Sequence, residues 1–172
     1  MSTKSRDVVV DVEADGPAPG LYSMVSFGAV VVERGLQRTF YTQLKPISDQ
    51  WVPEALAVSG HTREQTLKFT EPYDAMLSFD LWLADNVQGR PILWSDNPQF
   101  DGGFINYYFW RYLNRNPFGW SAAGMGSLYK GLERNVYARF HHLRDTKHTH
   151  HPVDDAVGNA EALLKMFDRM KT

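Results

Sequence analysis

Carboxylates occur at three widely separated points of this chain, each beside a segment with a regular pattern. Asp11 and Glu13 follow the β-branched run at 8–10, and because side chains alternate along a strand, both point from the same sheet face. If Asp101 and Asp155 come from helices that pack on that sheet, the four carboxylates share one pocket. Their mutual repulsion would raise their pKa values and cost stability unless cations held them together. We therefore expect hard divalent metals, which prefer oxygen ligands.

Three histidines, His148, His150 and His151, precede the last of these carboxylates. Imidazole exchanges a proton near neutral pH, which suits a general base. His150 lies five residues before Asp155 and His151 lies four residues before it. The other interpretations of the group are a solvated loop and a zinc site. The sequence favours a zinc site least, since carboxylates already supply hard oxygen ligands and no cysteine joins the histidines.

The elements that must position these side chains begin with strands. Residues 8–12, 24–33 and 39–44 are rich in β-branched and aromatic side chains, and 16–20 is a rigid loop of glycine, proline and alanine that leaves the first strand. The short, turn-like links between these strands indicate an antiparallel meander. A further strand is expected at 91–94.

Helical spacing of apolar residues predicts long helices at 72–87, 100–113 and 154–170. Shorter helices are expected at 52–56, from residue 62 onward, and at 127–132. Strands first, with helices interleaved later, predict an α/β fold in which helices cover a mixed sheet. The length fits a single domain, 1–172, and a chain of this size buries roughly 70% of the surface that its unfolded form exposes.

The composition excludes several classes of protein. Lys and Arg number 18 against 20 Asp and Glu, so bulk charge does not favour a polyanion, and nucleic-acid binding would have to be local or metal-mediated. The chain has no cysteine, which excludes disulfides and thiolate metal sites. The first six residues lack an apolar signal core, and no run approaches the roughly 18 apolar residues of a membrane span. We expect a soluble, cytoplasmic protein that does not contact membranes.

The spaced motifs resemble those of the DEDDh branch of the DnaQ-like 3′-5′ exonucleases, a family with a ribonuclease H-like sheet. The residues that match its three motifs are Asp11, Glu13, Gly16 and 27–30; Asn97, Phe100 and Asp101; and His150 and Asp155. Segments 42–46, 53–55 and 59–62 also resemble the part of the family that links its first two motifs. The resemblance therefore covers nearly the whole chain.

This resemblance implies a metal-dependent 3′-5′ exonuclease. Asp11, Glu13, Asp101 and Asp155 would hold two Mg²⁺ or Mn²⁺ ions about 4 Å apart, one activating water and the other stabilising the leaving 3′ oxygen. His150 would be the general base, and Glu13 would contact both metal and the terminal nucleotide. The product implied is a nucleoside 5′-monophosphate.

The resemblance also points to residues that meet the substrate: Ala14, Asn97, Phe100 and His61. Ala14 departs from the family, which usually has Thr there, so a contact at the substrate terminus is lost. The basic residues Arg134, Arg139, Arg144 and Lys147 would meet phosphates or form a solvated loop. The aromatic residues Phe104, Tyr107, Tyr108 and Trp110 would be core, an interface or a base-stacking platform.

Single-stranded or short RNA is the expected substrate, by analogy with small stand-alone exoribonucleases of the oligoribonuclease kind. The alternatives are a DNA exonuclease or proofreading subunit and, in a different class, a non-catalytic nuclease-fold module that binds a partner. The complete set of carboxylates disfavours the module, because a binding module gains nothing from their repulsion. Exposed aromatic residues and small size are consistent with a homodimer.

The carboxylate cluster generates a first prediction. Mn²⁺ at 100 times its dissociation constant should stabilise the native state by about 2.7 kcal/mol, because an ion that binds only the folded protein acts by mass action. Asp11→Asn should remain folded but lose most of this gain, since it removes a charged ligand. Thermal denaturation of both proteins in Mn²⁺ and in EDTA measures the difference. A structure with Asp101 or Asp155 far from Asp11 would contradict the cluster.

Overall fold

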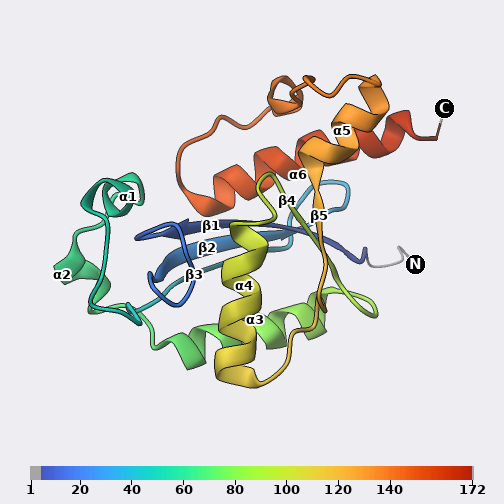
Figure 1. The fold of residues 1–172 in the computed structure, drawn as a ribbon. Helices are drawn as coiled ribbons and strands as arrows, with labels where there is room; N and C mark the ends of the chain where they lie inside the picture. Colours follow the sequence, from blue (N-terminus) through green and yellow to red (C-terminus); the bar gives the residue numbers. More distant parts are fainter. Residues whose placement is uncertain (1–4, 172) are drawn as a thin grey trace.

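The computed structural model describes residues 5–171, and its central feature is a five-stranded sheet with helices on both faces (Figure 1). The strands, in the spatial order β3-β2-β1-β4-β5, are β1 Asp7–Ala14, β2 Met24–Val31, β3 Thr39–Gln43, β4 Ile92–Ser95 and β5 Ala122–Gly124. β1 lies in the middle, with antiparallel β2 on one side and parallel β4 on the other. The sheet is therefore mixed, as expected from the sequence.

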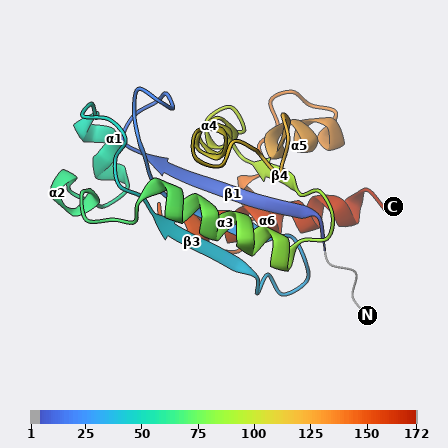
Figure 2. The same ribbon diagram turned by 90° about the horizontal axis from the view of Figure 1, so that it is seen from below.

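Helices cover both faces of this sheet. Their bounds are α1 Pro53–Val58, α2 Arg63–Thr66, α3 Pro72–Asn86, α4 Asp101–Leu113, α5 Met125–Glu133, the 3-10 helix η1 His141–Leu143, and α6 Pro152–Arg169. The short α1 and α2 lie beyond one end of the sheet (Figure 1, Figure 2). In Figure 1 α6 lies above the sheet and α3 below it. Seen from below, α3 lies in front of the sheet and α6 behind it (Figure 2).

Alternation along β1 separates two hydrophobic clusters. Val8, Val10 and Val12 belong to the cluster that contains the aromatic residues of α3 and α4, whereas Val9 belongs to the cluster formed with α5 and α6. β2 is buried along its whole length because helices cover both of its faces. Asp11 continues the Val9 side of the strand and therefore faces α6.

Most elements agree with the sequence patterns. The antiparallel meander of β1, β2 and β3 is confirmed, as are the long helices α3, α4 and α6. Strand β1 continues to Ala14 instead of ending at residue 12, because its pairing with β2 extends through a β-bulge between Glu13 and Ala14. β2 ends at Val31 and not at residue 33. The expected helix at 127–132 is the longer α5, and β5 was missed because Ala-Ala-Gly carries little strand signal.

The described residues contain no helix with the length and apolar character needed to cross a membrane. The expectation of a single domain spanning 1–172 stays a prediction, and its first four residues and Thr172 lie outside the described part.

Gly28 of β2 allows α6 to approach the sheet closely. A Cβ atom at this position would lie 2.5 Å from the carbonyl carbon of Pro152 and 2.6 Å from the nitrogen of Val153. Gly28 is also the direct partner of Asp11 in the β1–β2 ladder. The first turn of α6 therefore lies against the sheet beside Asp11, at a distance that only glycine permits.

This close approach predicts that Gly28→Ala destabilises the protein by about 1–3 kcal/mol, because backbone atoms must move to admit the methyl group. The same variant should also bind Mn²⁺ more weakly, since the first turn of α6 is displaced from Asp11. Urea denaturation measures the first effect and calorimetry the second. Gly126→Ala in α5 is the matched control, because nothing lies within 4 Å of a Cβ atom there. Equal stability of the two variants would contradict the account.

Candidate active site

Three carboxylates from two elements converge on the α6 side of β1. Asp11 and Glu13 alternate along the strand, and Asp155 lies in the first turn of α6. Asp11, Glu13 and Asp155 each offer an oxygen, and these atoms lie within 4.8 Å of one another. Gly28 makes this possible, because it lets the start of α6 reach the strand beside Asp11.

Asp101 joins this group from α4, which begins soon after β4. The β1–β4 pairing ends at Val9 and Trp94, and beyond that point the Val12 N–H donates to Oδ1 of Asp101 at 3.0 Å. Ser95 Oγ donates to the other carboxylate oxygen, Oδ2. Asp101 is buried, and these two bonds fix its carboxylate at the edge of β1.

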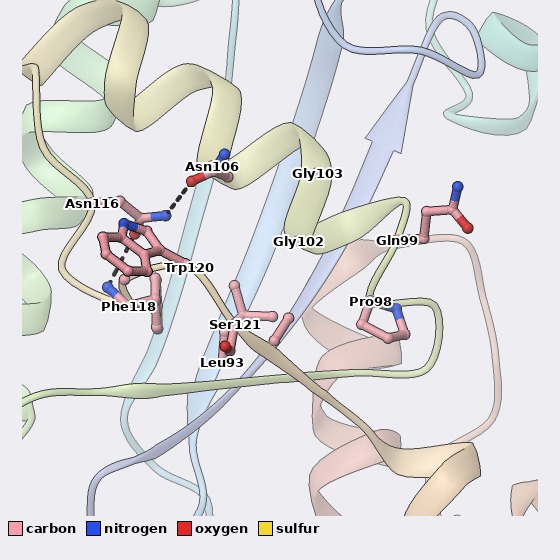
Figure 3. A pocket seen from close by; sticks show the side chains of 12 residues that line it. Leu93, Pro98, Gln99, Gly102, Gly103, Asn106, Asn116, Phe118, Trp120 and Ser121 are labelled. Atoms are coloured by element: carbon pink, nitrogen blue, oxygen red, sulfur yellow. Dashed lines mark hydrogen bonds between the residues drawn. The ribbon is translucent and has the colours of Figure 1, made fainter.

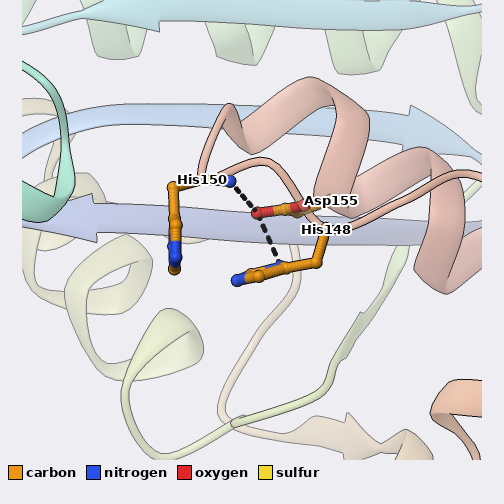
Figure 4. Close-up of side chains that lie close together, drawn as sticks. All are labelled: His148, His150 and Asp155. Atoms are coloured by element: carbon orange, nitrogen blue, oxygen red, sulfur yellow. Dashed lines mark hydrogen bonds and ion pairs between the residues drawn. The ribbon is translucent and has the colours of Figure 1, made fainter.

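The loop before α6 folds around Asp155. The backbone N–H groups of Thr149 and His150 donate to Oδ1 and Oδ2 of Asp155 at 3.0 and 3.1 Å. His148 Nδ1 lies 2.9 Å from Oδ2 (Figure 4). His150 has a positive φ of 61°, the left-handed conformation, which turns the chain back toward the helix. Asp155 is therefore held from several directions at once.

Burial and repulsion make the ionised form of these carboxylates unfavourable. Burial, followed by repulsion from Asp155 and Asp101, raises the pKa of Glu13 to about 7. Burial also raises the pKa of Asp101 to about 7, although hydrogen bonds from Ser95 and Val12 oppose the rise. For Asp11, burial and the repulsion of Asp101, Asp155 and Glu13 raise the pKa well above its ordinary range. Divalent cations bound to the oxygen atoms would relieve this repulsion.

The three histidines of the sequence pattern have different surroundings. His150 and His148 lie beside Asp155, with ring centroids 4.2 Å apart, and both are exposed. His151 instead contacts the ring of Tyr41 on β3, with centroids 4.9 Å apart. Of the two candidate bases, His150 and His151, it is His150 that has a ring nitrogen within 4.8 Å of a carboxylate oxygen of Asp155.

The residues expected to contact the substrate differ in their exposure to solvent. Phe100 is half-buried and packs edge-on against Phe104, while Asn97 is exposed and its carbonyl accepts from the N–H of Asp101 at 2.9 Å. Ala14 is buried in the core, so its side chain does not face solvent. His61 is half-buried and hydrogen-bonded to Gln43, whose strand position lies across β2 from Glu13.

Comparison with known proteins agrees with this arrangement. A family model described as an exonuclease, that of RNase T, matches residues 8–163. The 3′-5′ DNA exonuclease Cap18 of Escherichia coli is 41% identical over 128 residues, 73% of this chain and 68% of that protein. The chain belongs to the DEDDh family of 3′-5′ exonucleases. It is a nuclease, and the family generally uses divalent metal ions.

Solved structures of exonucleases share the fold. The nuclease domain of 3′hExo, a DEDDh family member bound to rAMP, has a TM-score of 0.76 and 16% identity, covering 97% of this chain and 94% of that one. E. coli Exonuclease I in complex with a dT13 oligonucleotide has a TM-score of 0.71 and 17% identity, covering 98% of this chain and 44% of that one. The ribonuclease H-like architecture expected from the sequence is therefore confirmed.

Several polar residues around the DEDDh site carry no motif of their own. Ser95 fixes Asp101, and the only sequence signal for it is a hydroxyl at the end of a strand. Arg144 is paired with Asp96 at 3.2 Å, and its side chain is only 11% exposed. The expectation that Arg144 meets phosphates stays a prediction; in this structure its guanidinium lies over the ring of Phe140 and beside Asp96. Its positive charge opposes the rise in the pKa of Asp11.

Adjoining hollows lie along α4 and the turn that precedes it. The first lies between the 17–19 loop and the turn at 97–100, and Gln99 connects it to the hollow shown in Figure 3. Gly103 and Asn106 line that hollow and also a third, which ends at Trp110 and Arg111. The aromatic residues of α4 thus divide: Phe104 and Tyr108 are core, whereas Trp110 is exposed, as is Trp120 beside the second hollow.

The raised pKa of Glu13 predicts a pH-dependent stability in the metal-free protein. Because its folded pKa of about 7 exceeds the ordinary 4.5, its stabilising contribution is complete below about pH 4.5 and is lost as pH rises through 7. Glu13→Gln cannot ionise, so its stability relative to wild type should increase from pH 5 to 8, on the order of 1 kcal/mol after allowance for solvent screening.

Urea denaturation in EDTA across this pH range measures the difference. Glu54→Gln, at an exposed position of α1, is the control for losing a carboxylate on the surface. A Glu13→Gln advantage that shrinks as pH rises would contradict the prediction.

Proposed function

We propose that this DEDDh exonuclease removes nucleotides from the 3′ end of single-stranded DNA, with Mg²⁺ or Mn²⁺ as cofactor. The observation that carries the proposal is the convergence of Asp11, Glu13 and Asp155 within 4.8 Å, with Asp101 adding to their repulsion. These carboxylates would hold two metal ions, which supply a nucleophile at neutral pH and charge stabilisation at the scissile phosphate. The product is a nucleoside 5′-monophosphate.

The protein's own groups have distinct roles in this mechanism. His150 accepts the proton of the attacking water, since its exposed imidazole lies beside Asp155 at the rim of the site. Glu13 orients the terminal nucleotide as well as binding metal. Ser95 and the backbone of the loop before α6 keep the carboxylates in position, so that little reorganisation accompanies the reaction.

The hollows along α4 support a single strand as the substrate. Phe100 and Asn97 border the hollow between the 17–19 loop and the turn at 97–100, and they would contact the terminal nucleotide. The hollows continue past Gln99 to the exposed ring of Trp120, which offers a face for base stacking. Amide and hydroxyl side chains and one arginine supply the remaining polar lining, consistent with a net charge that does not favour long duplexes.

DNA is preferred because the relative with 41% identity is a DNA exonuclease. RNA, the substrate expected from the sequence, is the second candidate, favoured by the small size of the chain. Structures at 16–17% identity include complexes with rAMP and with a dT13 oligonucleotide, so the fold itself accommodates either sugar. A homodimer and a cytoplasmic location remain predictions.

A direct test compares DNA and RNA oligomers of one sequence and several lengths. Each carries a 5′ label and is incubated with Mg²⁺, Mn²⁺ or EDTA. We expect a ladder of products shortened from the 3′ end, faster for DNA, and no products in EDTA. Asp101→Asn is the inactive control. Absence of cleavage with either ion would refute the proposed activity, and faster cleavage of RNA would reverse the substrate preference.

The position of His150 beside Asp155 predicts which histidine is the base. His150→Ala should reduce turnover by roughly 10²–10⁴-fold, the usual cost of losing a general base, and retain most metal binding. His151→Ala should cost far less, because its ring contacts Tyr41 on β3. Single-turnover cleavage at saturating Mn²⁺ gives the rates, and calorimetric titration gives the metal affinity. The assignment is wrong if His151→Ala is the more damaging change.

A further inference from the structure

A second group of potential metal ligands shares Asp155 with the acidic set. His148, His150 and Asp155 each offer one ligand atom, and these atoms lie within 4.8 Å of one another. His148 Nδ1 is 2.9 Å from Oδ2 of Asp155, and the two imidazole rings stand nearly perpendicular at 74° (Figure 4). This group differs from the acidic set in containing two nitrogen ligands and only one carboxylate.

The loop that carries the two histidines is fixed to the start of α6. Backbone N–H groups of Thr149 and His150 donate to Asp155, and the Thr149 hydroxyl donates to Asp154 at 3.0 Å. The side chain of His148 is 50% exposed and His150 is also exposed, so solvent ions reach both rings. The loop backbone is thus held by bonds to Asp155, the His148 ring lies against the same carboxylate, and both rings are open to solvent.

The ligand types select the ion. Two imidazole nitrogens and one carboxylate oxygen, with a fourth position open to solvent, match the ligand sets of zinc, whereas Mg²⁺ prefers oxygen ligands alone. We propose that His148, His150 and Asp155 bind Zn²⁺, and that the bound zinc inhibits the exonuclease. The site uses His148, which has no role in the reaction derived above.

The inhibition follows from shared ligands and rests on the proposed function. Asp155 belongs to both groups, so zinc bound to its carboxylate competes with its contribution to the acidic set. His150 bound to zinc cannot accept a proton from water, since the lone pair it needs is occupied. Zinc at this position therefore removes a base and a carboxylate together while the fold stays intact.

Calorimetric titration of the Mg²⁺-saturated protein with Zn²⁺ tests the binding. Wild type should bind one Zn²⁺ at this site, and His148→Ala should weaken that binding on the order of 10- to 100-fold. His151→Ala, the neighbouring exposed histidine, should leave the affinity unchanged. Thermal denaturation checks that the variants are folded. His148→Gln keeps a hydrogen-bond donor for Asp155 without an imidazole ligand, and it should also lose zinc.

Visible absorption of the Co²⁺ complex gives an independent reading, because imidazole nitrogen ligands alter the ligand field relative to oxygen alone. The spectrum of wild type should change on His148→Gln and not on His151→Ala. In the cleavage assay, zinc added to the Mg²⁺-supported reaction should inhibit wild type more strongly than His148→Gln, each compared with its own rate without zinc.

The outcomes separate this site from the proposed activity. Zinc affinity that is unchanged in His148→Ala and His148→Gln, or reduced equally in His151→Ala, overturns the site. Zinc bound at His148 without stronger inhibition of wild type overturns the inhibitory role. Should no nucleic acid be cleaved under any condition, the titration would still decide whether the site exists, and only the proposed function would fall.

Discussion

Repulsion among carboxylates on one half of β1 is the constraint on which the rest of this structure depends. Asp11, Glu13 and Asp155 lie within 4.8 Å, and Asp101 adds to the repulsion. Repulsion favours separation of these carboxylates, and hydrogen bonds hold the two that come from helices, Asp101 and Asp155, in place. Asp101 is bonded to the backbone of β1 and to Ser95, and Asp155 to the loop before α6. Hydrogen bonds accepted by Asp101 and Asp155 thus hold the carboxylates together against their repulsion.

The sheet supplies the stiffness that these anchors need. β1 lies between two hydrophobic clusters, and β2 beside it is buried throughout. Moving Asp11 away from Asp155 would mean moving a central strand or lifting α6 from Gly28. Either change would expose apolar surface, which costs about 25 cal/mol for each Å². Burial of the hydrophobic core therefore balances a repulsion that would otherwise open the site.

The sequence predicted the fold and the acidic residues because both leave local patterns. β-branched runs marked β1 and β2, and the alternation at Asp11 and Glu13 indicated their shared face. What remained hidden depends on contacts between distant segments. The pairing of Arg144 with Asp96 joins residues 48 positions apart, and no local pattern marks it. The sequence of β5 likewise carries no strand pattern, since its three small residues gain strand structure only by pairing with β4. The choice between DNA and RNA left no pattern to interpret.

Asp155 shows how one side chain links packing to chemistry. It lies on α6, whose approach is set by the missing side chain of Gly28, and it accepts hydrogen bonds from the loop that carries His150. Any change that lifts the helix therefore moves a carboxylate of the acidic set and the adjacent imidazole together. The same loop also brings His148 to Oδ2 of Asp155. The geometry that places a base beside the acidic site thus also creates, around the same carboxylate, a set of ligands with a different preference among metals.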